Sequence, residues 1–239
     1  MTTEDEDGKR RWKAPADTRA PAGGRTLAQK EHVKKKKLSK SSRVWVERQL
    51  NDPYVRRAKE AGYRARAAYK LLELDEKFGL LNRSSRVIDL GCAPGGWLQV
   101  AIEKGAARIA GVDLLTVEPL GEAAIFLGDV AEPGMEGQLM AALGDAPTLV
   151  LSDMAADTTG HRQTDHVRTV GLAEIAARFA IDNLARGGTF VAKVFQGGAQ
   201  GELLDLLKDN FDEVRHWKPP SSRVASPETF VIAKGFRGR

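Results

Sequence analysis

The most constraining stretch of the chain is R-V-I-D-L-G-C-A-P-G-G-W, which runs from Arg86 to Trp97. A short β-branched apolar run leads into a glycine-rich turn, and an amphipathic segment follows as far as Lys104. A strand, a glycine turn and a helix form the first unit of a nucleotide-binding α/β sheet, where a ligand packs on the turn and the helix N-terminus. A dinucleotide fingerprint needs glycine at its first, third and sixth positions, but Ala93 occupies the middle one. The spacing G-x-x-x-G-G therefore departs from that of a dehydrogenase.

The rest of the chain alternates between apolar runs and amphipathic segments, as a doubly wound sheet does. The expected strands are Arg86–Leu90, Arg108–Val112, Ala124–Leu127, Thr148–Leu151, Thr189–Val194, Glu213–His216 and Thr229–Ala233. The expected helices among them are Gly96–Lys104, Gly134–Leu143, Val167–Leu184 and Ala199–Asn210. A Pro/Ser-rich loop with no room for a helix joins the last two strands. We therefore predict an α/β, Rossmann-like fold: a seven-stranded, mostly parallel sheet with an antiparallel C-terminal hairpin and helices on both faces.

Charge divides the chain into a basic arm and a balanced body. Residues 1–48 hold 14 Lys and Arg against 7 Asp and Glu, whereas the remainder carries a net charge of −2. Residues 1–40 lack apolar periodicity and are expected to be disordered, and residues 41–239 are expected to form a single domain. The run Lys34–Lys37 is typical of an arm that binds a polyanion, although it also suits a solvated, solubilising tail.

Residues 41–80 are expected to form a helical segment that faces RNA. A helix is predicted over Tyr54–Phe78, interrupted near Gly62. Its first half interleaves six basic residues with three tyrosines: Arg56, Arg57, Lys59, Arg64, Arg66, Lys70, Tyr54, Tyr63 and Tyr69. Aromatic rings stack on bases and cationic side chains neutralise phosphate, so this mixture is typical of RNA-binding surfaces. A helix that merely presents a solvated basic face is the alternative.

The sequence also indicates the compartment. Cys92 is the only cysteine, so no disulfide can form within the chain, and a reducing compartment fits. Met1–Asp7 is acidic and lacks the apolar core of a signal peptide, and no apolar run approaches the roughly 18–20 residues that cross a bilayer. We expect a cytoplasmic protein without a membrane partner.

The glycine turn resembles the first motif of S-adenosylmethionine (SAM) methyltransferases. The methionine end of SAM lies over such a turn, here Gly91, Gly95 and Gly96, where a Cβ would collide. A carboxylate after the second strand suits the ribose hydroxyls, and Asp113 stands 22 residues after Gly91. Asp129 follows the third strand, where adenine needs an acceptor. Either aspartate can also be an ordinary turn or cap residue, but two in register with the turn favour cofactor binding.

Lys193 is the most informative single residue. It lies in T-F-V-A-K-V-F, which otherwise reads as a strand buried on both faces. An unpaired buried ammonium costs several kcal/mol, so it needs a partner or a function. Asp153 in L-V-L-S-D-M-A is the expected partner, because the carboxyl ends of parallel strands share one edge. The alternative is that Lys193 reaches past the strand end into solvent.

Four motifs in order resemble the FtsJ/RrmJ family of ribosomal RNA large-subunit 2′-O-methyltransferases: G-C-A-P-G-G-W, L-S-D-M-A, V-A-K-V-F-Q-G and S-S-R-x-x-S-x-E. The resemblance covers roughly Ser41 to Lys234, with Ala156 standing where proline is expected. It places the family's Lys-Asp-Lys-Glu catalytic tetrad on Lys70, Asp153, Lys193 and Glu228. It places the SAM contacts on Gly95, Trp97, Asp113, Asp129 and Asp153.

The resemblance implies SAM-dependent 2′-O-methylation of a ribose, a uridine in 23S rRNA of the large ribosomal subunit, by a monomer. Lys193 is expected to be essential, either taking the hydroxyl proton or orienting the hydroxyl as a cation. Asp153 would orient Lys193, while Lys70 and Glu228 would position the ribose. Burial, Lys70 and the SAM cation would lower the pKa of Lys193, whereas the two carboxylates would raise it, so the sequence leaves both roles open.

Three alternatives remain open at this point. The first keeps the enzyme but changes the RNA to a tRNA anticodon loop or an mRNA cap. The second is a non-catalytic RNA-binding or ribosome-assembly factor, against which the intact tetrad argues. The third is a nicotinamide-dependent oxidoreductase, against which the missing second glycine argues. A metal site is not expected, because no ligand pattern is formed by the four histidines, His32, His161, His166 and His216.

Overall fold

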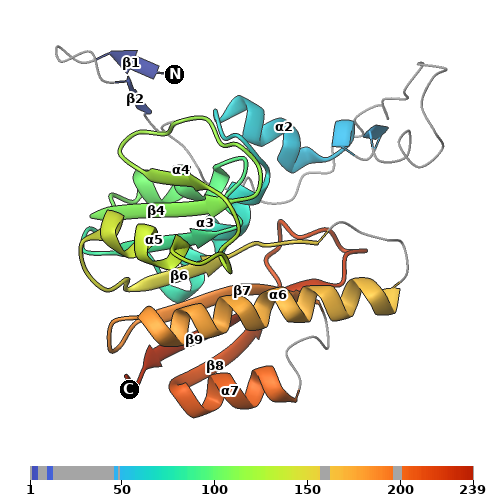
Figure 1. Cartoon of the computed structure of the whole chain (residues 1–239). Coiled ribbons are helices and arrows are strands. Elements are labelled where there is room, and N and C mark those ends of the chain that lie inside the picture. Colours follow the sequence, from blue (N-terminus) through green and yellow to red (C-terminus); the bar gives the residue numbers. More distant parts are fainter. Residues whose placement is uncertain are drawn as a thin grey trace.

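A computed structural model describes residues 2–4, 10–12, 46–47, 49–156, 162–195 and 201–238. The body is built on one seven-stranded sheet with the order β5-β4-β3-β6-β7-β9-β8 (Figure 1). Its strands are β3 (Arg86–Leu90), β4 (Arg108–Asp113), β5 (Ala124–Leu127), β6 (Leu149–Ser152), β7 (Thr189–Phe195), β8 (Phe211–Trp217) and β9 (Glu228–Phe236). Strands β3 to β7 pair in parallel, and β9 runs antiparallel between β7 and β8. The predicted fold class is confirmed.

Helices cover both faces of the sheet. They are α2 (Pro53–Glu60), α3 (Ala67–Phe78), α4 (Gly96–Glu103), α5 (Met135–Leu143), α6 (Arg162–Asn183) and α7 (Glu202–Asn210). Successive strand residues point to opposite faces, so Val87 packs with Leu71 of α3 and Leu98 of α4, whereas Ile88 belongs to the core formed by α5, α6 and α7. Two cores of buried apolar side chains therefore hold the sheet between two helical layers.

The predicted helix 54–78 is two helices, α2 and α3, with Gly62 between them at φ +77°, so the interruption expected near Gly62 is present. Some other element boundaries differ from the expected ones. Helix α6 begins at Arg162 rather than at Val167, because its first five residues are polar and give no apolar periodicity. Strand β8 begins at Phe211, directly after α7 and without a loop, and Phe211 pairs with Phe236.

The N-terminal arm is described at six positions. Thr2–Glu4 (β1) and Arg10–Trp12 (β2) form a separate two-stranded antiparallel sheet inside the segment expected to be disordered. The rest of residues 1–40, including the Lys34–Lys37 run, lies outside the described residues, so its expected disorder stays a prediction. In the part of the chain that the structure describes, no helix is both long enough and apolar enough to cross a membrane.

Candidate active site

Lys193 and Asp153 meet at the edge of the sheet where the parallel strands end. Lys193 lies in β7, Asp153 follows the neighbouring strand β6, and the side chain of Lys193 is only 8% exposed. Its Nζ lies 2.9 Å from Asp153 Oδ1 and donates a hydrogen bond of 2.7 Å to the Asp153 carbonyl oxygen. Because the ammonium is buried against a carboxylate, it does not reach out to solvent, and the pairing expected from the sequence is present.

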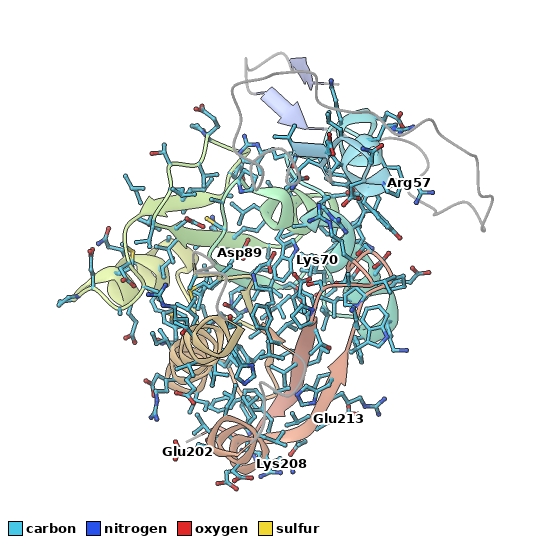
Figure 2. The ribbon with its side chains drawn as sticks, turned by 90° about the vertical axis from the view of Figure 1, so that its right-hand side faces the viewer. Arg57, Lys70, Asp89, Glu202, Lys208 and Glu213 are labelled. Atoms are coloured by element: carbon cyan, nitrogen blue, oxygen red, sulfur yellow. The ribbon has the colours of Figure 1, made fainter. Side chains whose placement is uncertain are left out.

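Lys70 and Glu228 complete a chain of four charged groups. Lys70 Nζ lies 2.7 Å from Glu228 Oε1 and 3.7 Å from Asp153 Oδ2. Glu228 opens β9, and the antiparallel register sets it opposite Phe195 at the end of β7. Figure 2 shows Lys70 near the middle of the molecule, not at its rim. The side chains therefore follow one another in the order Lys193, Asp153, Lys70, Glu228.

The charges of these four side chains stabilise one another. Burial alone would raise the pKa of Asp153, but Lys193 and Lys70 outweigh burial and hold that pKa below its ordinary value of 3.8. Burial would lower the pKa of Lys70, but Asp153 and Glu228 raise it above its ordinary value of 10.5. Asp153 is therefore a carboxylate and Lys70 an ammonium throughout the neutral range.

The glycine turn lies directly beside this chain of charges. The N–H groups of Gly91 and Cys92 both donate to the Val112 carbonyl oxygen, at 2.9 and 3.2 Å. Gly91 has φ +81°, and a Cβ there would lie 2.9 Å from the Cα of Met154, the residue after Asp153. Gly95, at φ +105°, caps the N-terminus of α4. The turn and the segment that carries Asp153 are therefore in direct contact.

Asp113 and Asp129 both act as turn residues in this structure. Asp113 accepts hydrogen bonds of 2.8 Å from the N–H groups of Leu115 and Ala93, and Asp129 accepts one of 2.9 Å from the N–H of Ala131. The bond to Ala93 ties the end of β4 to the glycine turn. A carboxylate oxygen has a second lone pair, so these bonds leave each aspartate able to accept from a ligand. Their cofactor contacts stay a prediction.

The indole of Trp97 is buried and already bonded within the protein. The residue is 3% exposed, its Nε1 donates 2.8 Å to the Ala67 carbonyl oxygen, and its ring packs on Phe230 at 5.8 Å between centroids. The indole is thus committed to the core between α3 and β9. A contact to SAM from Trp97 would come from its backbone N–H, which lies in the first turn of α4, where N–H groups have no partner within the helix.

Asp89 is a candidate that the sequence analysis missed. It is 1% exposed, and among the described residues neither carboxylate oxygen has a hydrogen-bond partner. Burial, followed by the charges of Asp153 and Asp113, raises its pKa well above the ordinary value of 3.8. An uncompensated buried acid is costly, and a cationic ligand on the adjoining turn would remove that cost. SAM carries a sulfonium and an ammonium, so this site fits SAM. The sequence feature that indicates Asp89 is an acidic residue within the apolar strand R-V-I-D-L.

Several basic residues of segment 41–80 are bonded to other parts of the protein. Arg64 donates to the carbonyl oxygens of Pro94, Glu118 and Pro119, at 3.3, 2.7 and 3.0 Å. Arg66 pairs with Asp52, and Lys70 belongs to the chain of charges described above. The exposed basic residues on α2 are Arg56 and Lys59. A role in binding RNA stays a prediction for this helix.

The three tyrosines of the same segment pack on one another. Tyr63 is 5% exposed and donates a 2.5 Å hydrogen bond to Glu103. The Tyr69 ring meets those of Tyr54 and Tyr63 edge-on, at centroid distances of 5.4 and 5.7 Å. The three rings therefore contribute to packing within the fold, and their stacking on RNA bases stays a prediction.

Other chemistry finds little support at this site. Burial, with Asp89 and Asp113, raises the pKa of the Cys92 thiol, so this cysteine is not an activated nucleophile. In the described ranges, no three His, Cys, Asp or Glu side chains are grouped so that they could hold a metal ion. His32 and His161 lie outside those ranges.

Known proteins share both the sequence and the fold. Residues 63–236 match the sequence model of the FtsJ-like methyltransferases. A ribosomal RNA large subunit methyltransferase E from Hyphomonas neptunium is 53% identical over 232 residues, which are 97% of this chain and 99% of that protein. The protein of the same name from Sphingopyxis alaskensis is 62% identical over 205 residues, which are 85% of this chain and 89% of that protein.

Among solved structures, a ribosomal RNA methyltransferase from Plasmodium falciparum superposes with a TM-score of 0.66 at 30% identity. The match covers 74% of this chain and all of that one. Residues 63–236, which match the family model, include the whole seven-stranded sheet and the four charged residues. The chain belongs to the FtsJ-like methyltransferase family and is a methyltransferase.

Proposed function

We propose that this enzyme transfers a methyl group from SAM to the 2′-hydroxyl of a ribose, a uridine in 23S rRNA of the large ribosomal subunit. The chain of Lys193, Asp153, Lys70 and Glu228 beside the glycine turn is the observation that carries the proposal. Support for the RNA comes from the relatives, because those cited above carry the name ribosomal RNA large subunit methyltransferase E. We further propose a monomeric enzyme that works in the cytoplasm.

SAM would supply a methyl group bonded to a positively charged sulfur. We assign its methionine end to the glycine turn, where Asp89 offers a buried carboxyl group without a hydrogen-bond partner among the described residues. Gly95 and the backbone N–H of Trp97, at the start of α4, would bind the same end. Asp113 and Asp129 would accept hydrogen bonds from the ribose and the adenine.

Lys193 would act on the ribose hydroxyl. Two directions around its Nζ are taken by oxygens of Asp153, at 2.7 and 2.9 Å. The third direction around Nζ holds a lone pair if the amine is neutral and a third N–H if it is charged. A neutral amine would take the hydroxyl proton as the oxygen bonds to the methyl carbon and the carbon–sulfur bond breaks, which would release a neutral thioether. An ammonium would orient the oxygen and stabilise its negative charge, and the proton would pass to water.

Lys70 and Glu228 would hold the ribose in place for this attack. Lys70 is charged and lies between the two carboxylates, so it can donate to a ribose oxygen, while Glu228 can accept from a hydroxyl. Fixing two reactants in a reactive geometry can lower a barrier by roughly 7–11 kcal/mol, so positioning alone is a large part of the expected catalysis.

The alternatives are weakened to different degrees. Membership of a methyltransferase family overturns the nicotinamide-dependent oxidoreductase. The assembled charges argue against a non-catalytic RNA-binding factor, since a scaffold would gain nothing from burying two lysines and an aspartate. The names of the relatives favour a ribosomal target over a tRNA anticodon loop or an mRNA cap.

The decisive experiment measures methyl transfer from labelled SAM to large ribosomal subunits isolated from a strain that lacks this protein. Wild type should label one ribose, and Lys193→Ala should lower the rate by about 100-fold or more. Lys234→Ala is the matched control, because Lys234 is a half-buried lysine of β9 that donates 2.8 Å to the Phe78 carbonyl oxygen, away from the site. Undiminished labelling by Lys193→Ala would contradict its role, and labelling of tRNA alone would contradict the ribosomal target.

A further inference from the structure

Three consecutive residues of the loop between β8 and β9 are each bonded to a different part of the protein. Ser221 donates from its N–H and its hydroxyl to Glu73 Oε2, at 2.8 and 2.6 Å. Ser222 donates its hydroxyl to Glu228 Oε1 at 3.0 Å, and Arg223 Nε lies 3.0 Å from Asp52 Oδ2. Both serines are buried, at 1% and 5% exposure. The triplet Ser221–Arg223 thus links two helices to one of the four site residues.

Asp52 connects the triplet to helix α2. Its side chain is 6% exposed and its Oδ1 caps α2 by accepting 3.0 Å from the N–H of Tyr54. Its Oδ2 receives two guanidinium groups, from Arg223 and from Arg66, and Arg66 also donates to the Ser221 carbonyl oxygen. A single buried carboxylate therefore fixes both the helix and the triplet.

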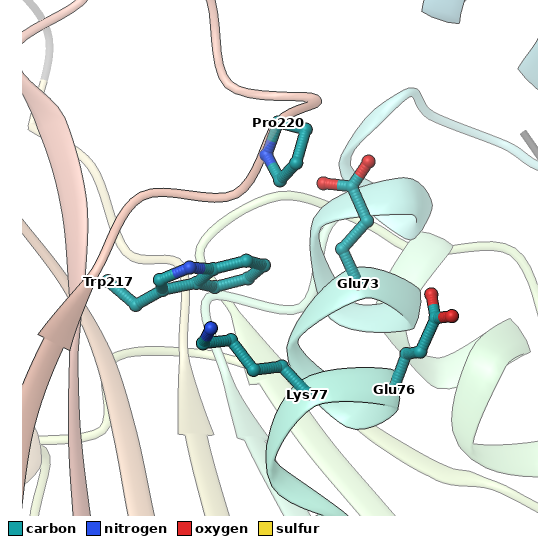
Figure 3. Close-up of a pocket in the computed structure, with 5 residues that line it drawn as sticks. All are labelled: Glu73, Glu76, Lys77, Trp217 and Pro220. Atoms are coloured by element: carbon teal, nitrogen blue, oxygen red, sulfur yellow. The ribbon is translucent and has the colours of Figure 1, made fainter. Parts of the chain in front are cut away.

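Helix α3 holds the same triplet from a second side. A surface hollow of about 260 Å³ separates α3 from the end of β8, and Figure 3 shows Glu73 facing Pro220 across it. Its lining residues are Glu73, Glu76, Lys77, Trp217 and Pro220. Glu73 stands one helical turn after Lys70, so the turn that presents Lys70 to the site also holds Ser221. Helix α3 thus positions both the loop, through Glu73, and Lys70.

The bonds continue into the chain of charges. Glu228 Oε1 accepts from Ser222 at 3.0 Å and lies 2.7 Å from Lys70 Nζ, so a single oxygen joins the triplet to the site. Moving Ser222 would release that oxygen and change where Lys70 and Glu228 meet. A displacement of about 1 Å in a positioning group can lower a rate about 100-fold.

We infer that Asp52 is a positioning residue for methyl transfer, acting through Arg223 and Ser222 on Glu228. This inference rests on the function proposed above for the four charged residues. Asp52 touches neither the glycine turn nor Lys193 among its hydrogen bonds and ion pairs in the described residues. Its effect should therefore fall on kcat for methyl transfer and leave the KM for SAM unchanged.

Asp52→Asn tests this role, because asparagine still caps α2 but loses the charge that holds both arginines. The matched control is Asp75→Asn. The side chain of Asp75 is 7% exposed against 6% for Asp52. Its Oδ1 accepts from two backbone N–H groups, and its Oδ2 pairs with Lys104 at 2.7 Å. Both variants should unfold at lower temperature, but only Asp52→Asn should lower kcat, by about 10-fold or more. Arg223→Gln should reproduce that loss from the other partner.

A double-mutant cycle distinguishes positioning from general damage. If Asp52 acts through Glu228, adding Asp52→Asn to Glu228→Gln should lower the residual kcat no further. The inference would be overturned if the kcat losses of the two single variants multiplied in the double variant. It would also be overturned if Asp52→Asn kept the wild-type kcat and unfolded at the same temperature as Asp75→Asn. A wild-type enzyme that methylates no ribose would instead overturn the proposed function, so the two failures are distinguishable.

Discussion

The backbone of Met154 passes so close to Gly91 that a Cβ on Gly91 would lie 2.9 Å from the Met154 Cα and 3.0 Å from its nitrogen. These two residues belong to the glycine turn and to the segment that carries Asp153. Their contact therefore sets the distance between the expected methyl donor and the charged residues that act on the acceptor.

Gly91→Ala should push these two segments apart. We expect SAM to bind about 10-fold more weakly and the free energy of unfolding to fall by about 1–3 kcal/mol, because both the positive φ and the close approach exclude a side chain. Gly144→Ala is the control, since Gly144 has φ +74° but nothing within 4 Å of its Cβ position. Titration calorimetry should show a weaker affinity for SAM in Gly91→Ala but not in Gly144→Ala. Equal affinities of the two variants for SAM would contradict the role of the contact between Gly91 and Met154.

Asp89→Asn should stabilise the protein and weaken SAM binding. Because the folded state raises the pKa of Asp89, the ionised carboxyl destabilises the folded state increasingly as pH rises above 3.8. Removing that charge should raise Tm at pH 7 by a few degrees, while the loss of a negative group beside the cationic ligand should raise the Kd for SAM.

Thermal unfolding with and without SAM measures both effects. The variant should have the higher Tm alone and the smaller increase in Tm on adding SAM. Asp75→Asn serves as the comparison, because Asp75 is buried but paired with Lys104, so its loss should lower Tm. A lower Tm for Asp89→Asn would show that its carboxyl is compensated in the free enzyme.

Asp153 and Lys70 should not contribute to the pH dependence of methyl transfer near neutral pH. Asp153, with its lowered pKa, keeps its charge until the pH falls below 3.8, and Lys70, with its raised pKa, keeps its charge until the pH exceeds 10.5. Neither changes charge between about pH 6 and pH 9. If Lys193 takes the hydroxyl proton as a neutral amine, log kcat should rise with pH in this window.

Single-turnover rates on ribosomal subunits across that window provide the measurement. Asp153→Asn should lower the rate at every pH, because it removes the group that orients Lys193. A rate for wild type that is flat with pH would contradict proton transfer to Lys193 and assign it the role of an orienting cation.

The exposed basic residues of α2 should contribute to RNA affinity without affecting chemistry. Replacing Arg56 and Lys59 together with alanine should weaken binding to 23S rRNA and reduce the slope of log K against log salt by about 1–2, since two phosphate contacts are lost. Lys208→Ala on α7 is the control, because Figure 2 places Lys208 far from Arg57 and α2. Filter binding at several salt concentrations would test this, and an unchanged slope would exclude α2 from the RNA interface.

The fold and the main site could be predicted because their signals are local. Strand periodicity sets which residues end at the carboxyl edge of the sheet, and a charged residue within an apolar strand marks Lys193 as one with a partner. Asp89 carries the same signal in β3. It was missed because the adjoining glycines drew the interpretation toward the turn.

The sequence shows less where the partners are distant along the chain. It does not show that Arg64 bonds to the carbonyl oxygens after β4 or that Arg66 pairs with the carboxylate of Asp52. Similarly, the sequence does not show that the Trp97 indole donates to the Ala67 carbonyl oxygen, which leaves the backbone N–H for the predicted contact with SAM. A helical pattern shows which residues are polar, but only the tertiary structure shows which of them are already paired.

The position of β9 determines when the active site can exist. This last strand is inserted between β7 and β8, and it contributes Glu228. During synthesis, the glycine turn, Asp113 and Lys193 all leave the ribosome before Glu228 does. The group of four charged residues can therefore assemble only after β9 has left the exit tunnel, so the proposed activity depends on a strand that is made after every other part of the site.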